Sequence, residues 1–116
     1  MRRGQVWLVE LDPSRGHEAN KTRMVVIVSS DASNDVVHRL QRGVVTVVPL
    51  TSASKPAYDF QAAIPAEPGN GLEVNSIAQA EQIRAVDFSR FVRPLGTLRD
   101  EHCAAIDDAI ITHLDL

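Results

Sequence analysis

The strongest constraint on the fold is the run of apolar residues at positions 24–28, Met-Val-Val-Ile-Val. A strand that carries apolar side chains at every position, rather than at alternate positions, is typical of a strand buried on both faces of its sheet. This is the longest unbroken apolar run in the chain, and it is far shorter than the ~20 residues that a membrane-spanning helix needs. We therefore expect a sheet with one doubly buried strand, and no membrane segment.

Other parts of the chain also show strand patterns. Residues 5–12 predict a first strand, in which Trp7, Val9 and Leu11 share one face. Asp12 is followed by a Pro-Ser-Arg-Gly sequence, which breaks the strand and begins a loop that should extend to Arg23. The remaining predictions are a short helix within 32–37, a half-exposed strand over 58–64, a helical turn at 87–90 and a short strand at 93–97.

Two further strand regions would carry polar residues at their ends. A strand over 44–48 should end near Pro49, so that Thr51 and Ser52 follow it. Residues 74–86 predict one or two strands, in which Gln79, Glu81 and their apolar neighbours share one side if the pairing is continuous.

The final segment has a different periodicity. Cys103, Ile106, Ile110 and Leu114 recur at helical spacing, which predicts an amphipathic helix over about 100–114 whose apolar stripe packs on the sheet. Many short strands followed by one terminal helix indicate an α+β, mostly β fold, built as a small, strongly bent antiparallel sheet or half-barrel. The length of 116 residues suits a single domain over 1–116.

Charge and cysteine content narrow the functional classes. The net charge of −3 argues against a protein that coats nucleic acid with a broadly basic surface. One short segment nevertheless carries three positive charges, on Arg15, Lys21 and Arg23, and a single negative charge, on Glu18. This local excess of positive charge suggests that the segment binds a small anionic region of a partner. The single cysteine, Cys103, cannot form an internal disulfide, so a cytoplasmic location fits best.

Motifs for metals and nucleotide cofactors are missing from the sequence. One cysteine and four scattered histidines give no metal-ligand spacing, and no glycine-rich phosphate loop is present, so we expect neither a metal nor a cofactor. Polar residues instead gather at the predicted strand ends, where functional sites are commonly mounted. They are His17, Glu18 and Arg23, then Thr51 and Ser52, then Gln79, Glu81, Gln82 and Arg84.

Several segments, taken in order, resemble a known family. They are residues 3–18 (RGQVWLVELDPSRGHE), Arg23 with 24–29 (MVVIVS), 48–52 (VPLTS), 80–87 (AEQIRAVD) with Arg90, and an ending from 98–101 (LRDE) through a helix to 114–116 (LDL). Each segment alone is a weak signal, but the ordered set covers nearly the whole chain and is specific. The sequence resembles the MazF/PemK/Kid toxin family.

This resemblance implies a fold, an activity and a set of partners. The fold would be an SH3-like small barrel with a C-terminal helix, of the CcdB/MazF kind, assembled as a homodimer. The activity would be that of the toxin of a bacterial type II toxin–antitoxin pair, a metal-independent, sequence-specific endoribonuclease. Such toxins cut single-stranded RNA (mRNA, tRNA or rRNA), leave 2′,3′-cyclic phosphate and 5′-OH ends, and so inhibit translation and growth. The partner would be a cognate antitoxin with an acidic, partly disordered segment that covers Arg23, and DNA would be contacted only through the toxin–antitoxin complex.

The resemblance also assigns residues. The family's catalytic arginine falls on Arg23 and its motif threonine on Thr51. His17 matches a histidine of the Kid branch, and Glu81 stands where that branch has an aspartate that acts as base. Gln79 replaces an arginine of the Kid branch. The chain also departs from the family in having Met24 after the catalytic arginine, where proline is usual, and in lacking a common loop glycine before it.

Residue chemistry agrees with this assignment. In metal-free cleavage the neighbouring 2′-OH attacks the phosphate, so the enzyme must remove a proton, stabilise added negative charge and protonate the leaving oxygen. The planar guanidinium of Arg23 suits the second task, but a guanidinium stays protonated and is a poor base. Glu81 and His17 are therefore the two candidates for the general base, and the Thr51 hydroxyl can hold a phosphate oxygen. The predicted substrate contacts are Arg15, Glu18, Lys21, Ser52, Gln79 and Gln82.

Two alternatives to an endoribonuclease remain. A CcdB-like toxin binds gyrase through a C-terminal tryptophan, whereas the one tryptophan here is Trp7, which disfavours that function. The other is a non-catalytic SH3-like binding module, or decayed toxin, in which Arg23 only pairs with Glu18 at the surface. Cys103 lies on the apolar stripe of the final helix, so we expect it to be buried and structural rather than nucleophilic.

Overall fold

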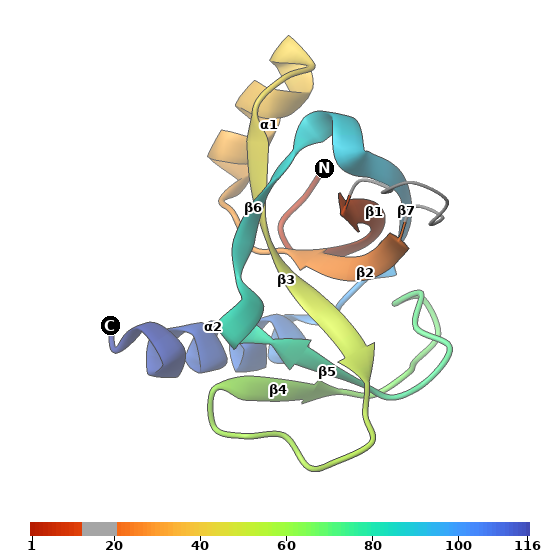
Figure 1. Ribbon diagram of the computed structural model, residues 1–116, viewed down its shortest axis with the longest axis vertical. Helices are drawn as coiled ribbons and strands as arrows, with labels where there is room; N and C mark the ends of the chain where they lie inside the picture. The colour runs from red at the N-terminus through yellow and green to blue at the C-terminus, as the bar shows by residue number, and fades with distance from the viewer. Residues whose placement is uncertain (13–20) are drawn as a thin grey trace.

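The computed structural model describes residues 1–12 and 21–116. These residues form a seven-stranded antiparallel sheet and two helices (Figure 1). The strands are β1 (Gln5–Asp12), β2 (Lys21–Ile27), β3 (Val44–Ser52), β4 (Gln61–Ile64), β5 (Ser76–Gln79), β6 (Arg84–Asp87) and β7 (Phe91–Thr97). The helices are α1 (Asp31–Leu40) and α2 (Asp100–Leu114), with short 3-10 turns η1 (Ala80–Gln82) and η2 (Phe88–Arg90).

The sheet is open and strongly bent, which confirms the predicted bent antiparallel architecture. Its strand order is β4-β5-β3-β2-β1-β7, and β6 pairs with β3 outside this path. The first half of β3 therefore pairs with β6, and its last residues pair with β5. Because β3 changes partner along its length, one long strand belongs to both parts of the sheet.

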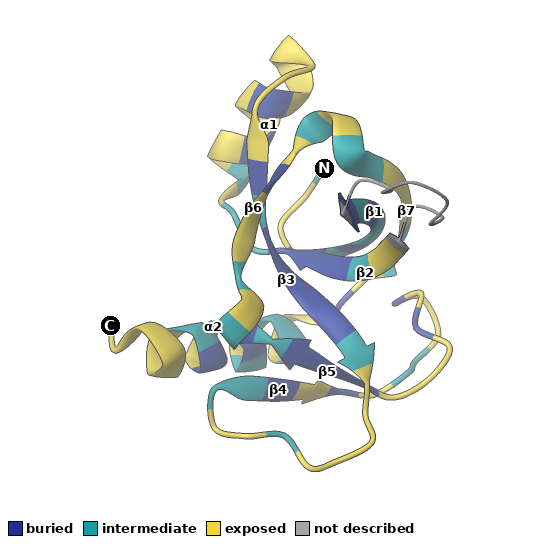
Figure 2. Ribbon diagram, in the orientation of Figure 1, coloured by how far each residue is buried: buried dark blue, intermediate teal, exposed yellow. Residues whose placement is uncertain are grey.

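The run at 24–28 is buried on both faces, as predicted. Val26 belongs to an apolar cluster beneath α2 that also contains Val48 and Ile106. Val25 and Ile27 belong to a second cluster on the opposite face, with Val9, Leu11, Val45, Val47 and Val86. Figure 2 shows this pattern, with the second half of β2 and most of β3 buried. Strand β2 is thus the layer between two small cores.

Three strand boundaries differ from the predictions. Strand β2 begins at Lys21, so Arg23 lies within a strand rather than in a loop. Strand β4 begins at Gln61 because residues 58–61 form a turn, closed by a hydrogen bond of 2.9 Å from the Gln61 N–H to the Tyr58 carbonyl. The region 74–86 forms two strands separated by η1, so its pairing is not continuous.

The prediction that the third strand ends near Pro49 is wrong, because β3 continues to Ser52. On one side Pro49 is opposite Val25 of β2. On the other side the paired residues are Val47 with β6 and Leu50 with β5, so Pro49 falls between the two partners. A proline lacks the backbone donor that a central strand needs, and this is a position where no strand on that side requires one.

Helix α2 has the predicted bounds, and its stripe is buried in part. Ile106 is fully buried, and Cys103 and Ile110 pack against the core beneath α2. Leu114 was expected on the packed stripe but is 48% exposed, because the last turn of α2 extends beyond the sheet (Figure 1). Neither helix in the described part of the chain is long and apolar enough to cross a membrane.

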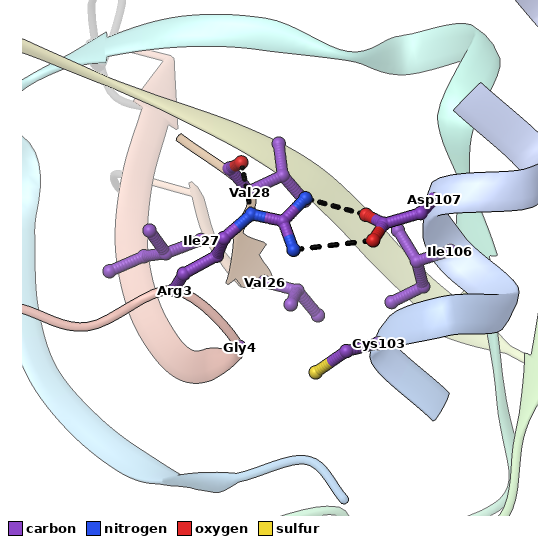
Figure 3. A pocket seen from close by; sticks show the side chains of 8 residues that line it. All are labelled: Arg3, Gly4, Val26, Ile27, Val28, Cys103, Ile106 and Asp107. Atoms are coloured by element: carbon purple, nitrogen blue, oxygen red, sulfur yellow. Dashed lines mark hydrogen bonds and ion pairs between the residues drawn. The ribbon is translucent and has the colours of Figure 1, made fainter. Parts of the chain in front are cut away.

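The N-terminal segment fastens α2 to the sheet (Figure 3). The Arg3 guanidinium donates to both Asp107 carboxylate oxygens, at 2.6 and 3.3 Å, and to the Val28 carbonyl at 2.9 Å. Gly4 has a φ of +89°, and a Cβ there would lie 2.8 Å from the Cys103 sulfur. Burial raises the pKa of the Cys103 thiol, which supports a structural and not a nucleophilic role for this residue.

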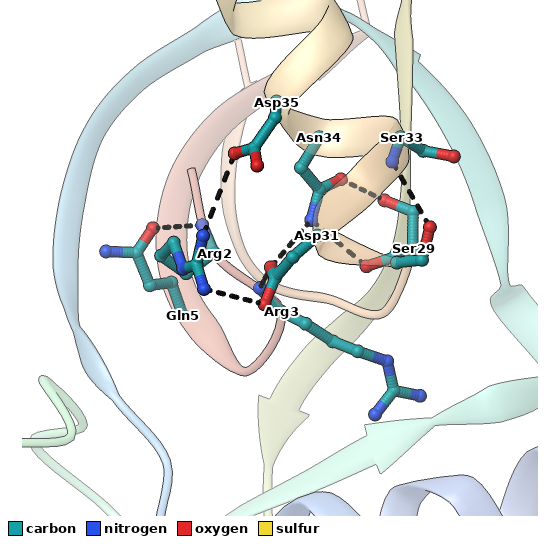
Figure 4. A network of polar contacts seen from close by, with 9 residues as sticks. Arg2, Arg3, Gln5, Ser29, Asp31, Ser33, Asn34 and Asp35 are labelled. Atoms are coloured by element: carbon teal, nitrogen blue, oxygen red, sulfur yellow. Dashed lines mark hydrogen bonds and ion pairs between the residues drawn. The ribbon is translucent and has the colours of Figure 1, made fainter.

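The segment between β2 and α1 is fixed by a polar network (Figure 4). Asn34 is fully buried, and its side chain bonds the Ser29 hydroxyl at 2.5 Å and the Ser29 carbonyl at 3.0 Å. Ser30 caps α1 by accepting a hydrogen bond from the Ser33 N–H. The cap starts the helix at Asp31 and α1 continues to Leu40, so it is longer than the predicted helix within 32–37.

Replacement of Ile106 by alanine should lower the free energy of unfolding by about 2–5 kcal/mol, because it opens a cavity under α2 where the side chain is 1% exposed. Urea denaturation would measure the change. Ile111 lies on the same helix but is 46% exposed, so Ile111→Ala is the matched control and should cost under about 1 kcal/mol. Equal losses in the two variants would contradict the packing described here.

Candidate functional site

Three of the predicted site residues lie on adjacent strands and share one face of the sheet. Arg23 is on β2, Thr51 is near the end of β3, and Gln79 ends β5. Their chain neighbours Met24 and Leu50 belong to the core beneath α2. Since side chains alternate along a strand, Arg23, Thr51 and Gln79 point to the face away from α2.

The Arg23 guanidinium is held by neutral groups. Its Nη2 donates to the Gln79 Oε1 at 3.1 Å and approaches the Leu50 carbonyl oxygen at 3.5 Å. The Arg23 side chain therefore crosses β3 to reach β5. An amide orients a guanidinium without neutralising its charge, so the cation stays available to an anionic ligand.

An open cleft lies beside Arg23. It has a volume of about 390 Å³ and is lined by Leu8, Thr22, Arg23, Met24, Leu50, Thr51 and Ser52. Thr51 is the lining residue that shares the face of Arg23, whereas Ser52, the next residue of β3, alternates to the face of α2. A guanidinium and a hydroxyl on one face, beside an open cleft, are groups that bind a phosphate.

Glu81 lies on η1 and is held by a residue that the sequence did not single out. Its Oε2 accepts a hydrogen bond of 2.6 Å from the Gln61 Nε2, while its Oε1 is buried and has no hydrogen-bond partner. The Gln61 Oε1 in turn accepts from the Tyr58 N–H at 3.2 Å. Gln61 is directly opposite Gln79 in the pairing of β4 with β5. The pairs Arg23–Gln79 and Gln61–Glu81 therefore occupy neighbouring positions on the sheet.

Gln61 could be found in the sequence only as a polar position in an alternating segment. Its role depends on the pairing of β4 with β5 and on the turn η1 that places Glu81, and both bring together residues distant in the sequence. Local periodicity does not report such pairings.

The remaining predicted residues divide into two groups. Gln82 is exposed on η1, beside Glu81. Arg15, His17 and Glu18 lie outside the described residues, as does the Lys21 side chain. Arg90, part of the third matching segment, donates to the carbonyls of Glu10 and Leu11 at 3.2 and 3.3 Å, so it anchors the end of β1.

Within residues 1–12 and 21–116, no group of three or more histidine, cysteine, aspartate or glutamate side chains is arranged to hold a metal ion. The chemistry available on the face of Arg23 and beside it is that of one guanidinium, the Thr51 hydroxyl, the Gln61 and Gln79 amides and the Glu81 carboxylate.

The amino-acid sequence is similar to known toxins along its whole length. The sequence model of PemK-like, MazF-like toxins of type II toxin–antitoxin systems matches residues 2–114. The chain is 48% identical to endoribonuclease MazF9 of Mycobacterium tuberculosis over 116 residues, which is all of this chain and 98% of that protein.

The fold is also found in solved structures. A MazE–MazF structure from Deinococcus radiodurans superposes with a TM-score of 0.79 at 25% identity, over 100% of this chain and 96% of the other. A mycobacterial endoribonuclease in complex with its cognate antitoxin superposes with a TM-score of 0.76 at 23% identity, over 100% of this chain and 96% of the other. The bent sheet with a C-terminal helix is the MazF fold, and with a match over residues 2–114 the chain belongs to the PemK/MazF family of toxins of type II toxin–antitoxin systems.

Proposed function

We propose that this toxin is a metal-independent endoribonuclease that cleaves single-stranded RNA at short sequences and so inhibits translation and growth. The observation that carries the proposal is the Arg23 guanidinium, oriented by the Gln79 amide and open to the cleft that contains Thr51 and Ser52. Its 48% identity to an endoribonuclease over the whole chain supports the same activity.

The proposed reaction is an internal displacement at phosphorus. The 2′-oxygen of one nucleotide attacks the adjacent phosphate and loses its proton to a base, and the bond to the 5′-oxygen breaks as that oxygen gains a proton. Arg23 donates two hydrogen bonds to the phosphate and stabilises the negative charge that develops on it. The Thr51 hydroxyl holds a phosphate oxygen. The products are a 2′,3′-cyclic phosphate and a 5′-OH.

Glu81 is the base in this proposal. Its Oε2 is fixed by Gln61 and its Oε1 is buried without a partner, so one of the two oxygens would have to become accessible to the 2′-OH when RNA binds. His17 is the competing candidate.

The gyrase-binding alternative has no comparable support. Trp7 would be its candidate residue, but the Trp7 ring packs edge-on against Phe91, with ring centroids 5.6 Å apart, and its Nε1 donates to Gln5. The Trp7 side chain therefore packs within the fold, which disfavours a role for it in binding gyrase.

The partners follow from the family and from the charge of the site. A cognate antitoxin would bind the toxin homodimer through an acidic, partly disordered segment that covers Arg23. Such a segment would compete with RNA for the same guanidinium, and this competition would be the basis of inhibition.

Arg23→Ala should reduce the rate of RNA cleavage by about 10²–10³-fold or more, because no guanidinium then donates to the phosphate as negative charge develops on it. The assay uses purified protein, a single-stranded RNA pool and excess EDTA, with analysis of the product ends. Arg23→Lys should recover only part of the rate, since a lysine lacks the planar fork. The matched control is Arg93→Ala, an exposed arginine on β7, which should cleave like the wild type. Absence of cleavage by folded, antitoxin-free wild type would reject the endoribonuclease and favour a non-catalytic module.

The two candidate bases can be separated by comparing Glu81→Gln with His17→Gln. If Glu81 is the base, its substitution should lower kcat by about 10²–10⁴-fold, and the histidine variant should retain most of the activity. The reverse order would transfer the role of base to His17.

The same measurement tests Gln61 as a positioning residue. Gln61→Leu should lower kcat, because it releases Glu81 but leaves the cleft around Arg23 intact. In the Glu81→Gln background the Gln61→Leu substitution should have no further effect on kcat. Additive losses would mean that Gln61 acts independently of Glu81.

Binding of the antitoxin should be sensitive to salt, because an acidic segment is attracted by the cations near Arg23. The dissociation constant of the complex should rise about tenfold or more between roughly 0.05 and 0.5 M NaCl. Arg23→Ala should weaken binding and flatten this dependence, whereas Arg93→Ala should do neither. An affinity that is the same at both salt concentrations would refute the charge-matching mechanism.

A further inference from the structure

The most exposed aromatic side chain of the described residues is not used by the core. The chain has one tryptophan, one tyrosine and three phenylalanines. Trp7 packs on Phe91, and Phe88 lies against the core on the face away from α2. Tyr58, in contrast, is 64% exposed, in the loop between β3 and β4. The exposed part of the Tyr58 ring is not used in packing, so we considered whether this surface binds a ligand.

Tyr58 is nevertheless held in a defined orientation. Its ring stacks on Phe60 with centroids 5.2 Å apart and an interplanar angle of 8°. The Phe60 ring lies 6.3 Å from that of His113, in the last turn of α2. The Tyr58 backbone is fixed at both polar groups, since its N–H donates to the Gln61 side chain and its carbonyl accepts from the Gln61 N–H. One face of the Tyr58 ring is covered by Phe60, and the stacked pair of Tyr58 and Phe60 is called the platform here.

The platform is linked directly to the proposed catalytic groups. Gln61, which holds the Tyr58 N–H, also donates to Glu81 and is opposite Gln79, the partner of Arg23. From β2 to β4 the distance is three strand spacings, or about 14 Å. Phe60 lies against His113 of α2, so Tyr58 is at the β4 edge on the α2 side, whereas Arg23 points to the other face of the sheet. An RNA strand whose phosphate is at Arg23 would therefore pass round the β4 edge to bring a neighbouring nucleotide to Tyr58.

We infer that Tyr58 is a stacking site for a nucleobase that flanks the cleaved bond of the RNA substrate. A flat ring with one face open provides the surface on which unpaired bases stack, and stacking accepts any base. Charged side chains also stand in this loop, where Lys55 and Asp59 are exposed. Lys55 can in addition pair with a phosphate of the same strand. This inference rests on the endoribonuclease function proposed above.

The test measures RNA binding separately from cleavage. Fluorescence anisotropy would follow a single-stranded RNA whose 2′-oxygens are methylated, so that the attacking hydroxyl is blocked and binding alone is observed. Tyr58→Leu removes the aromatic ring and should raise the dissociation constant about tenfold, while Tyr58→Phe and Tyr58→Trp should bind within about twofold of the wild type. The matched control is Leu40→Ala, an exposed apolar residue at the end of α1, which lies at the opposite end of the molecule from the β3–β4 loop (Figure 1).

An abasic scan of the RNA would locate the stacked base. Removal of that one base should weaken wild-type binding about as much as Tyr58→Leu does, and should have no further effect on the Tyr58→Leu variant. Equal sensitivity of both proteins at every position would overturn the stacking site.

The outcomes separate this inference from the proposed function. Cleavage of unmodified RNA with unchanged binding by Tyr58→Leu would overturn the stacking site alone. Binding that depends on Tyr58, without cleavage of any RNA, would overturn the endoribonuclease alone. No RNA binding by the wild type would overturn both. A Tyr58→Leu variant that loses affinity only for the antitoxin would assign the ring to a protein interface and reject the stacking site.

Discussion

The change of partner along β3 is the constraint on which the site depends. Residues up to Val47 pair with β6, and those from Leu50 pair with β5, so the chain between β5 and β6 must turn where β3 passes from one to the other. That turn is η1, and it carries Glu81. A sheet whose strands paired continuously would put Glu81 at an ordinary strand position. The bend in the sheet therefore produces the place where a carboxylate can lie beside β4.

The doubly buried β2 makes this bend possible. An antiparallel sheet with one apolar face needs only one covering layer, but Val25 and Val26 of β2 belong to different cores. Helix α2 covers one face, and the curled strands β1, β3 and β6 enclose the other. Apolar burial alone specifies the register of β2 weakly, because a slip of one residue would exchange one apolar side chain for another. The same slip would move the Arg23 side chain to the face of α2, so the polar end of the strand distinguishes the registers. Arg23, next to this buried run, is consequently placed by a rigid strand and not by a loop.

The sequence predicted the elements whose signals are local. Strand β1 and helix α2 have the predicted bounds, since alternation in the one and helical spacing in the other suffice. The differences arise where distant segments meet. The continuation of β3 through Pro49 depends on the gap between β5 and β6, and the exposure of Leu114 depends on where the sheet ends. In the site, Arg23, Thr51 and Glu81 were identified by resemblance, but Gln61 was not, because its contact with Glu81 needs both the β4–β5 pairing and the turn η1.

Two neutral amides separate the opposite charges of the site, and this separation has a functional consequence. A direct ion pair between Arg23 and Glu81 would have to be broken whenever a phosphate bound, at the cost of leaving a carboxylate beside an anionic substrate. Instead Gln79 orients the guanidinium and Gln61 orients the carboxylate, each through a hydrogen bond that leaves the charge in place. Because Gln61 and Gln79 are opposite each other in one strand pair, the same pairing fixes both orientations. The cation can then bind the phosphate while the carboxylate remains a separate proton acceptor, as internal cleavage of RNA requires.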